Sequence, residues 1–280
     1  MVETKVRGLG TKAKIKKARE KEKKVVKILF LTFALIVVLV TSYFAYTYLQ
    51  PASQEPFRLK AALVDHLSLT YPNQTFVDAA TTILQQAGYT VDYYSGSKTT
   101  VEFWRELATH GYSVMILRVH SSATAGEEKE VPLCFFTAQS YSQSDYVSEQ
   151  LNGEIGKCSY LPFEPPYYFA ITPKFVESSM NGKFNNTFVI MMGCEGLRNT
   201  AMAEAFIAKG AKAYLGWNGS ITVGDTDRAT QYLLQHLVAQ NETVHQATTK
   251  VMEDVGVNPE DNSILQYFPN DAGKYVVLHG

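Results

Sequence analysis

The sequence predicts an α/β fold, a three-layer sandwich with a mostly parallel sheet, preceded by one transmembrane helix. Three observations predict it. An uncharged apolar run occupies residues 28–49. Beyond it, short apolar stretches alternate with amphipathic stretches, several of which end at glycine. Strands separated by single helices are typical of a parallel sheet with helices on both faces, and the 280 residues fit one such domain behind the apolar run.

The charge of the chain is strongly divided along its length. The 27 residues before the apolar run carry eleven basic and three acidic residues, which leaves 15 basic and 24 acidic residues for the rest. Basic charge confined to a tail beside an apolar run indicates a membrane surface. Nucleic acid is not expected as a partner, because no aromatic residues are interleaved with the basic residues of 12–27. That stretch is most simply a solvated helix or one that faces lipid headgroups.

The apolar run at 28–49 is 22 residues long. At a rise of about 1.5 Å per residue it can cross a hydrocarbon core of about 30 Å. Tyr43, Tyr46 and Tyr48 lie at its far end, as in an interfacial belt. The lysines on its near side predict a cytoplasmic N-terminus at the cell membrane and one span. A cleaved signal peptide is the alternative, but the run is long and no small-residue cleavage site follows.

The single span predicts that everything beyond it lies outside the cytoplasm. Residues 50–56 carry two prolines and read as a short tether, so the folded domain is expected at 57–280. Four glycosylation triplets lie beyond the run and agree with an external glycoprotein, at Asn73, Asn185, Asn218 and Asn241. The three cysteines allow a disulfide between Cys134 and Cys158 with Cys194 left free, or three unpaired thiols.

The alternation of strands and helices occurs in two blocks. The first block has expected strands at 59–64, 90–94 and 112–119 and helices at 75–87 and 101–110. The second has strands at 187–192 and 213–217 and helices at 199–209, 226–239 and 243–255. Residues 120–186 between them read as an insertion or a set of long loops, with a β-rich subdomain as the alternative, and they contain strand pieces at 133–137 and 168–171.

Two of the expected strands run into reactive side chains. The third ends at His120 and the fourth at Cys194, in the segments YSVMILRVHS and TFVIMMGC. The carboxyl ends of parallel strands share one edge of a sheet, so neighbouring strands would bring the imidazole to the thiol. An imidazole can take the thiol proton, and the resulting thiolate is a nucleophile. Gly193 would let a tight turn expose the sulfur, and the Cys194 amide could hold an oxyanion.

These segments resemble a known family. The order of an apolar strand ending in His, then a later strand ending in Cys, is similar to the caspase-like fold of clan CD cysteine peptidases, which include caspases, gingipains, legumains, separases and CHAT-domain proteins. The following stretch GLRNTAMAEAFIAKGAKAYLGWNGS resembles the helix and strand after the nucleophile in gingipain-like and CHAT-like members. The resemblance covers about residues 59–255, with its specific parts at 112–121 and 187–220. It implies catalytic roles for His120 and Cys194.

The resemblance has departures and leaves other residues to place. Ser121 stands where the family usually has glycine beside the histidine, at a candidate oxyanion position, and no residue matches a specificity pocket. His66, after the first strand, could line the cleft or be a rim histidine. Glu195 could orient a substrate cation or cap the next helix. Asp225 and Asp227 could shape the cleft, or Asp225 could cap its helix.

The sequence therefore favours a membrane-anchored, extracytoplasmic cysteine peptidase or related hydrolase acting on a peptide or protein. No cofactor is expected, and no spacing of His, Cys and carboxylates resembles a metal site. The alternative is a catalytically inactive caspase-like surface module that binds a peptide or protein partner. A third reading is an α/β surface domain in which the pairing of His120 with Cys194 is coincidental.

Overall fold

The computed structural model describes residues 3–49, 59–123, 133–161, 164–259 and 262–277. The chain divides into two units, residues 1–56 and residues 57–280. The expected tether at 50–56 lies outside the described residues.

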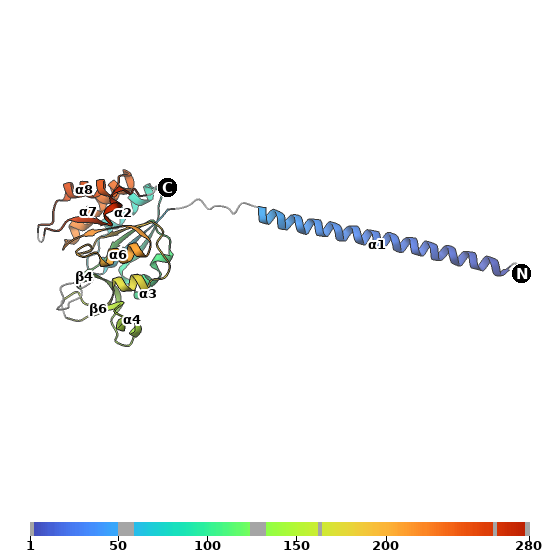
Figure 1. Ribbon diagram of the computed structural model, residues 1–280, viewed down its shortest axis with the longest axis horizontal. Helices are drawn as coiled ribbons and strands as arrows, with labels where there is room; N and C mark the ends of the chain where they lie inside the picture. Colours follow the sequence, from blue (N-terminus) through green and yellow to red (C-terminus); the bar gives the residue numbers. More distant parts are fainter. Residues whose placement is uncertain (1–2, 50–58, 124–132, 162–163, 260–261, 278–280) are drawn as a thin grey trace. The chain divides into compact units, whose positions relative to one another are not determined.

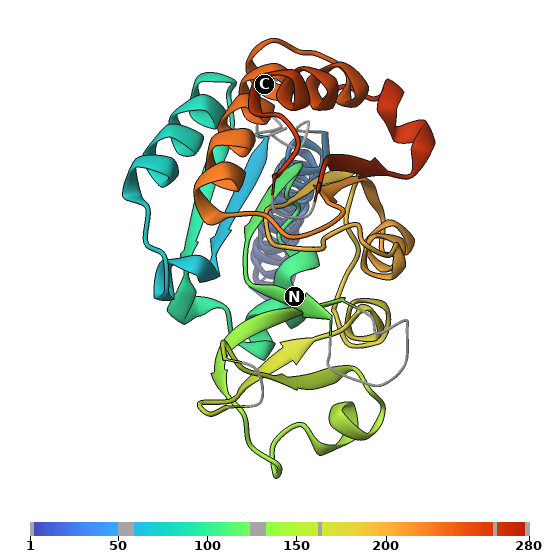
Figure 2. The same cartoon turned by 90° about the vertical axis from the view of Figure 1, so that its left-hand side faces the viewer.

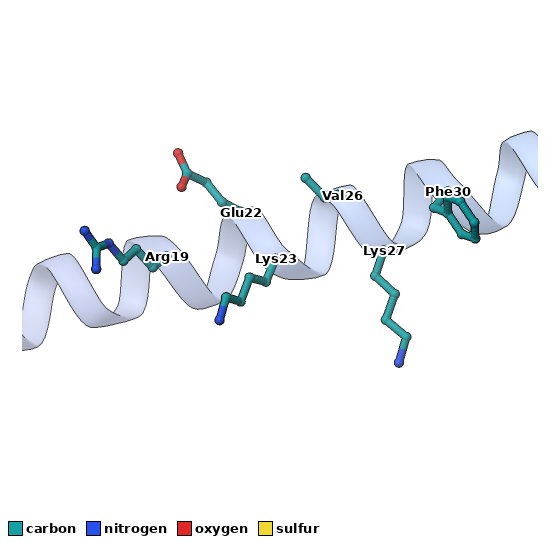
Figure 3. Close-up of a pocket in the computed structure, with 6 residues that line it drawn as sticks. All are labelled: Arg19, Glu22, Lys23, Val26, Lys27 and Phe30. Carbon is teal, nitrogen blue, oxygen red and sulfur yellow. The ribbon is translucent and has the colours of Figure 1, made fainter.

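The described residues of the first unit form one long helix, α1 (Glu3–Leu49), which includes most of the basic tail and the apolar run. Its part Arg19–Tyr46 is long and apolar enough to cross a membrane. The apolar side chains of this part are exposed, as Phe30 and Phe33 illustrate. Figure 3 shows where the basic and apolar parts meet, at Arg19, Glu22, Lys23, Val26, Lys27 and Phe30. The hollow that these six residues line belongs to one helix surface, and it suggests no ligand site.

The second unit is built on a six-stranded sheet with the order β10-β9-β8-β3-β1-β2. Five neighbouring strands are parallel, and β10 runs antiparallel to β9 at one edge. The predicted α/β class with a mostly parallel sheet is thus confirmed. The strands are β1 (Lys60–Asp65), β2 (Thr90–Ser95), β3 (Val114–Arg118), β8 (Thr187–Met191), β9 (Ala211–Trp217) and β10 (Leu265–Phe268).

Helices pack on both faces of this sheet because its central strands are apolar on both sides (Figures 1 and 2). Along β3, Val114 and Ile116 join one core, and Met115 and Leu117 join the other, as the two-residue period of a strand requires. The first core includes α2 (Gln74–Gln86), α7 (Val223–Leu234) and α8 (Val244–Val255). The second includes α3 (Val101–Glu106), α5 (Pro173–Ser178) and α6 (Ala201–Ala208).

The expected insertion between His120 and the fourth strand contains a second, antiparallel sheet. Its order is β4-β5-β7-β6, and the short helix α4 (Val147–Leu151) lies between β5 and β6 in sequence. The strands are β4 (Ser121–Ala123), β5 (Leu133–Ser140), β6 (Ile155–Cys158) and β7 (Tyr168–Ile171). A β-rich subdomain is therefore the alternative that the structure supports, and its buried side chains Phe135 and Phe169 pack into the second core.

Several boundaries differ from the sequence-based expectation. The helix expected at 101–110 is α3 followed by the 3₁₀ helix η3 (Leu107–Thr109). The helix expected at 226–239 begins earlier, because the Thr222 side chain accepts from the Asp225 amide and caps α7. Asp225 is therefore not the cap. The same helix ends in a π-helical turn, η4 (Gln235–Ala239). The remaining short helices are η1 (His66–Leu69), η2 (Gly96–Lys98) and η5 (Asn270–Lys274).

Candidate functional site

The strands that carry the candidate dyad are direct neighbours. β3 pairs with β8 in parallel, with Leu117 opposite Met191. His120 and Cys194 follow these strands, so both lie beyond the same edge of the sheet. The Ser121 hydroxyl donates a hydrogen bond to the Cys194 carbonyl over 2.6 Å. The segments that follow β3 and β8 therefore lie side by side beyond the strand ends.

Gly193 allows the two segments to approach each other this closely. A Cβ at this position would lie 2.5 Å from Ser121 Oγ and closer still to the Val119 carbonyl oxygen. A backbone carbonyl cannot yield as a flexible side chain can. The glycine thus serves close packing of the two strand ends, in addition to any freedom it gives the turn before the cysteine.

His120 is held by a hydrogen bond that the sequence did not suggest. Its Nε2 lies 2.8 Å from Oγ1 of Thr70, in the turn after η1. The ring is half-buried, and this burial lowers the pKa of His120 to about 4, with the nearby positive charge of Arg118 as the second cause. The imidazole is therefore neutral at pH 7, which is the form that can accept a proton.

Aromatic rings surround the His120 imidazole. The ring centroids of Tyr160, His66, Phe136 and Tyr71 lie 5.0, 5.8, 5.9 and 6.0 Å away. Two of these rings, Phe136 and Tyr160, come from the small sheet and the segment after β6. The inserted residues therefore contribute to the site.

His66 is fully buried, which differs from a rim position. Its Nε2 lies 3.3 Å from the Tyr160 hydroxyl. Its buried Nδ1 has no hydrogen-bond partner among the described residues. Burial, and secondarily the neighbouring His120, lowers the pKa of His66 to about 4. The structure thus brings His66 to the site as a neutral neighbour of His120.

The Cys194 thiol is half-buried and packs against the core that includes α2, α7 and α8. Its Sγ lies 3.6 Å from the Ile221 carbonyl oxygen, to which it donates. The thiol and the His120 imidazole thus each make a hydrogen bond outside the pair. For the thiol to lose its proton, its bond to Ile221 has to be exchanged for one to a base.

The peptide between His120 and Ser121 has an informative orientation. The His120 carbonyl accepts from the Phe136 amide of β5 over 3.0 Å. In a trans peptide the N–H points opposite to the C=O, so the Ser121 N–H points away from the small sheet. A serine supplies this N–H as well as a glycine does. The departure from the family pattern at this position therefore leaves a backbone donor in place.

Glu195 does not cap the next helix, because α6 begins at Ala201 after its N-cap residue Thr200. The Glu195 carboxylate pairs with Arg198, and its amide donates to the Gly219 carbonyl over 2.8 Å. The residue adopts a left-handed conformation with φ of 60°. Its backbone therefore joins the turn after the cysteine to the end of β9.

A buried ion network lies directly behind the site, and the sequence analysis did not identify its centre. Arg118 is fully buried and donates to Asp65 over 2.7 Å and to both carboxylate oxygens of Asp227 over 2.7 and 2.9 Å. Asp65 ends β1, and Asp227 lies in α7. The available signal was an arginine inside an otherwise apolar strand, because an arginine is almost never fully buried unless it is paired.

The bridge considered between Cys134 and Cys158 is not formed. Both are buried free thiols, and β7 lies between their strands β5 and β6. Two strand spacings amount to about 9–10 Å, beyond the roughly 7 Å between Cα atoms that a disulfide allows. Burial raises the pKa of Cys134 to about 12 and also raises the pKa of Cys158.

The four glycosylation triplets fall into two groups. Asn185 and Asn241 are exposed. Asn73 is half-buried, and its Nδ2 donates to Asp227 over 2.8 Å. Asn218 is half-buried, and its Oδ1 accepts from the Ile264 amide over 2.8 Å. The two exposed asparagines are the better candidates for a glycan.

Among the described residues, no group of three or more His, Cys, Asp and Glu side chains could hold a metal ion. No protein-family model matches the chain. No curated protein matches it either.

Proposed function

We propose that residues 57–280 form a cysteine peptidase or related hydrolase of caspase-like fold, with Cys194 as nucleophile and His120 as general base. The observation that carries the proposal is the parallel pairing of β3 with β8. The Ser121–Cys194 hydrogen bond of 2.6 Å fixes the two segments beyond the strand ends against each other. Strand order adds support, because β2 lies on one side of β1 and β3 on the other, and ligands of open α/β sheets bind near such a switch in strand order.

The reaction would proceed in two stages. His120 accepts the Cys194 proton, and the thiolate sulfur bonds to the carbonyl carbon of the substrate. The Ser121 and Cys194 amides are the candidate donors to the resulting oxyanion. The oxyanion collapses, the C–N bond breaks, and His120 returns its proton to the leaving amine. Water then attacks the thioester, with His120 again as base, and releases the acid and the thiol.

The electrostatics of His120 keep its ring in the form that can accept a proton. Its lowered pKa, about 4, keeps the ring neutral at the pH of most extracytoplasmic compartments. In the resting form, the Cys194 thiol donates its hydrogen bond to the Ile221 carbonyl. In the reactive form the thiol would exchange that acceptor for the imidazole, and catalytic hydrogen bonds are often made only when substrate is bound.

Helix α1 would anchor this domain in a membrane. Its part Arg19–Tyr46 has the required length and composition, and the basic residues precede the apolar run. By the positive-inside rule the N-terminus would be cytoplasmic and the domain external. Glycosidase treatment of the chain made in a eukaryotic secretory system tests this side. A mobility shift that disappears in the Asn185→Gln, Asn241→Gln double variant agrees with it, whereas an unglycosylated chain in that system contradicts it.

A second candidate is a catalytically inactive module of the same fold that binds a peptide or protein partner. The observation that favours it is that the imidazole is bonded to Thr70 and the thiol to Ile221. In such a module these bonds would persist when the partner binds.

The distinguishing experiment uses the full chain in detergent micelles with a quenched fluorescent peptide library. Hydrolysis that is lost in Cys194→Ala, strongly reduced in His120→Ala and unchanged in Cys134→Ala is the expected result. Cys134→Ala is the matched control because that thiol is buried in the small sheet. Hydrolysis that persists in Cys194→Ala contradicts the proposal. Saturable peptide binding without hydrolysis favours the inactive module.

A further inference from the structure

The buried ion network and the His120 imidazole are joined by one short segment, residues 66–73. We infer that Arg118 is a positioning residue for His120 and that it acts through this segment by way of Tyr71 and Thr70. The inference rests on the proposed function, because it describes how the base of that reaction is oriented. Arg118 itself touches neither the thiol nor a substrate.

All three members of the network hold the segment. The Asp65 carboxylate accepts from the Ser68 amide over 3.0 Å. Nη2 of Arg118 donates to the Tyr71 carbonyl over 3.0 Å. The Asn73 side chain donates to Asp227 over 2.8 Å. The contacts are spaced two or three residues apart, so the segment cannot shift without breaking at least one bond to a buried charge.

Thr70 lies between two of these contacts and transmits the constraint. Its hydroxyl is 2.8 Å from His120 Nε2, and the next ring along the chain, Tyr71, lies 6.0 Å from the His120 ring. Because Nε2 is engaged, Nδ1 is the ring nitrogen left to exchange a proton with Cys194. Loss of the Thr70 contact would leave the ring able to turn either nitrogen toward the thiol.

The geometry requires an arginine. Its guanidinium serves Asp65, both oxygens of Asp227 and the Tyr71 carbonyl at once, and it lies 5.6 Å from the centre of the Phe76 ring. A lysine has one nitrogen on a flexible stem and cannot copy this planar fork. Arg118→Lys therefore keeps the positive charge but gives up the simultaneous contacts that fix the segment.

The competing explanation is that Arg118 serves only to stabilise the fold, and it predicts a different result. Replacing Arg118 would then lower stability but leave the orientation and the titration of His120 in the folded protein unchanged. A positioning residue changes the orientation and the titration of His120 in a protein that is still folded. Among the described residues, the titratable side chains whose rings lie beside His120 are His66, Tyr71 and Tyr160, and the Arg118 charge acts on it as well.

The test uses the full chain in detergent micelles with isotope-labelled histidine rings. It compares Arg118→Lys and Thr70→Val by two measurements, the pH titration of the His120 ring signals and the rate of Cys194 alkylation by chloroacetamide. In both variants we expect the pH titration of the His120 ring signals to differ from that of the parent chain, because either ring nitrogen can then turn toward the thiol, and the alkylation rate at pH 7 to fall about tenfold.

Arg105→Lys is the matched control. Arg105 also binds two carboxylates and a carbonyl, those of Glu102, Glu149 and Ser179, but it lies on α3. We expect this variant to leave both measurements unchanged.

Two results would overturn the inference. One is a folded Arg118→Lys variant in which the His120 titration and the alkylation rate match the parent chain. If Arg118→Lys does not fold, Thr70→Val decides, because Thr70 is exposed and its change cannot disturb the core. Unaltered His120 signals in Thr70→Val would also overturn the inference. Altered His120 signals in a chain that hydrolyses no peptide would leave the positioning role standing while removing the proposed hydrolase.

Discussion

Two regions of the molecule hold a thiol in opposite surroundings. One is the edge of the main sheet beyond the carboxyl ends of β3 and β8, called the edge below, and the other is the small antiparallel sheet. Cys194 follows a parallel strand and is half-buried beside polar backbone. Cys134 lies in β5 and Cys158 is the last residue of β6, and both are buried among apolar neighbours, where burial raises the pKa of each thiol. The two regions also differ in what holds them together. Buried charge and close backbone approach organise the edge, whereas apolar packing organises the small sheet.

A residue type alone therefore says little about chemistry. Full burial in the small sheet makes a cysteine one more apolar side chain. Cys194 is only half-buried, and its place after a parallel strand of the main sheet puts it beside the segment that follows the neighbouring strand. The predictions below test whether the edge depends on charge, neutral histidine and close approach as this comparison requires.

The largest expected effect comes from removing the charge at the centre of the edge. Arg118→Met leaves the carboxylates of Asp65 and Asp227 buried without a cation. We expect the free energy of unfolding to fall by about 3–5 kcal/mol, the usual cost of breaking a buried pair. Urea denaturation of the full chain in detergent measures it. Arg228→Met is the control, because Arg228 is exposed and pairs with Asp225; we expect a change of less than about 1 kcal/mol. Equal losses of stability in Arg118→Met and Arg228→Met would show that the buried ion network contributes no more than an exposed ion pair.

The next effect depends on pH. His66 is neutral in the folded chain because its pKa is lowered to about 4, whereas in the unfolded chain it titrates near 6.5. Between these values the unfolded chain binds the proton more readily. Stability should therefore fall as pH drops from about 6.5 to 4, by up to about 3 kcal/mol from this residue.

Denaturation of parent and His66→Phe chains at pH 7 and pH 4.5 measures that contribution. The variant should lose less stability on acidification than the parent, since it has no imidazole to protonate at this position. The control His245→Gln changes an exposed histidine. It should lose as much stability between pH 7 and pH 4.5 as the parent chain does. An unchanged pH dependence in His66→Phe would show that His66 is not buried as a neutral ring.

A smaller effect is expected from close approach at the edge. Gly193→Ala places a methyl group against the Val119 carbonyl and the Ser121 hydroxyl, at an expected cost of about 1–3 kcal/mol for overpacking. Gly224→Ala is the matched control, because a Cβ at Gly224 meets nothing within 4 Å and alanine favours the helix. Thermal unfolding of both variants provides the comparison. A Gly193→Ala chain as stable as the parent would mean that the two strand ends are not closely packed.

Much of the main sheet could be predicted because its strands are buried on both faces. Continuous apolar runs such as 114–117 and 187–191 mark such strands, and the alternation with helices gives the parallel order. The strand β10 was missed because LQYF is short and mixed, and it follows a stretch of polar residues. In the small sheet, β5 and β7 matched apolar pieces, whereas β4 (SSA) and β6 (IGKC) carry too few apolar residues to stand out.

The candidate site was predictable only in part, for a physical reason. His120 and Cys194 could be found because each directly follows an apolar strand. Thr70 and Tyr160 could not, because they reach His120 from segments 50 and 40 residues away, and nothing local in their sequence marks that contact. Asp227 had been noted beside the cleft, but its partner Arg118 looked like one polar residue in an apolar strand. Long-range pairing of charges leaves little trace in a single sequence.

The most direct test of the central claim is the rate at which chloroacetamide modifies Cys194 in the native full chain, followed by mass spectrometry of intact protein. The account predicts that Cys194 reacts first, that Cys134 and Cys158 react only after unfolding, and that His120→Ala slows the reaction of Cys194 about tenfold or more. His110→Ala, which changes a histidine remote from the dyad, should leave the rate unchanged. A Cys194 rate that is the same with and without His120 would contradict the account.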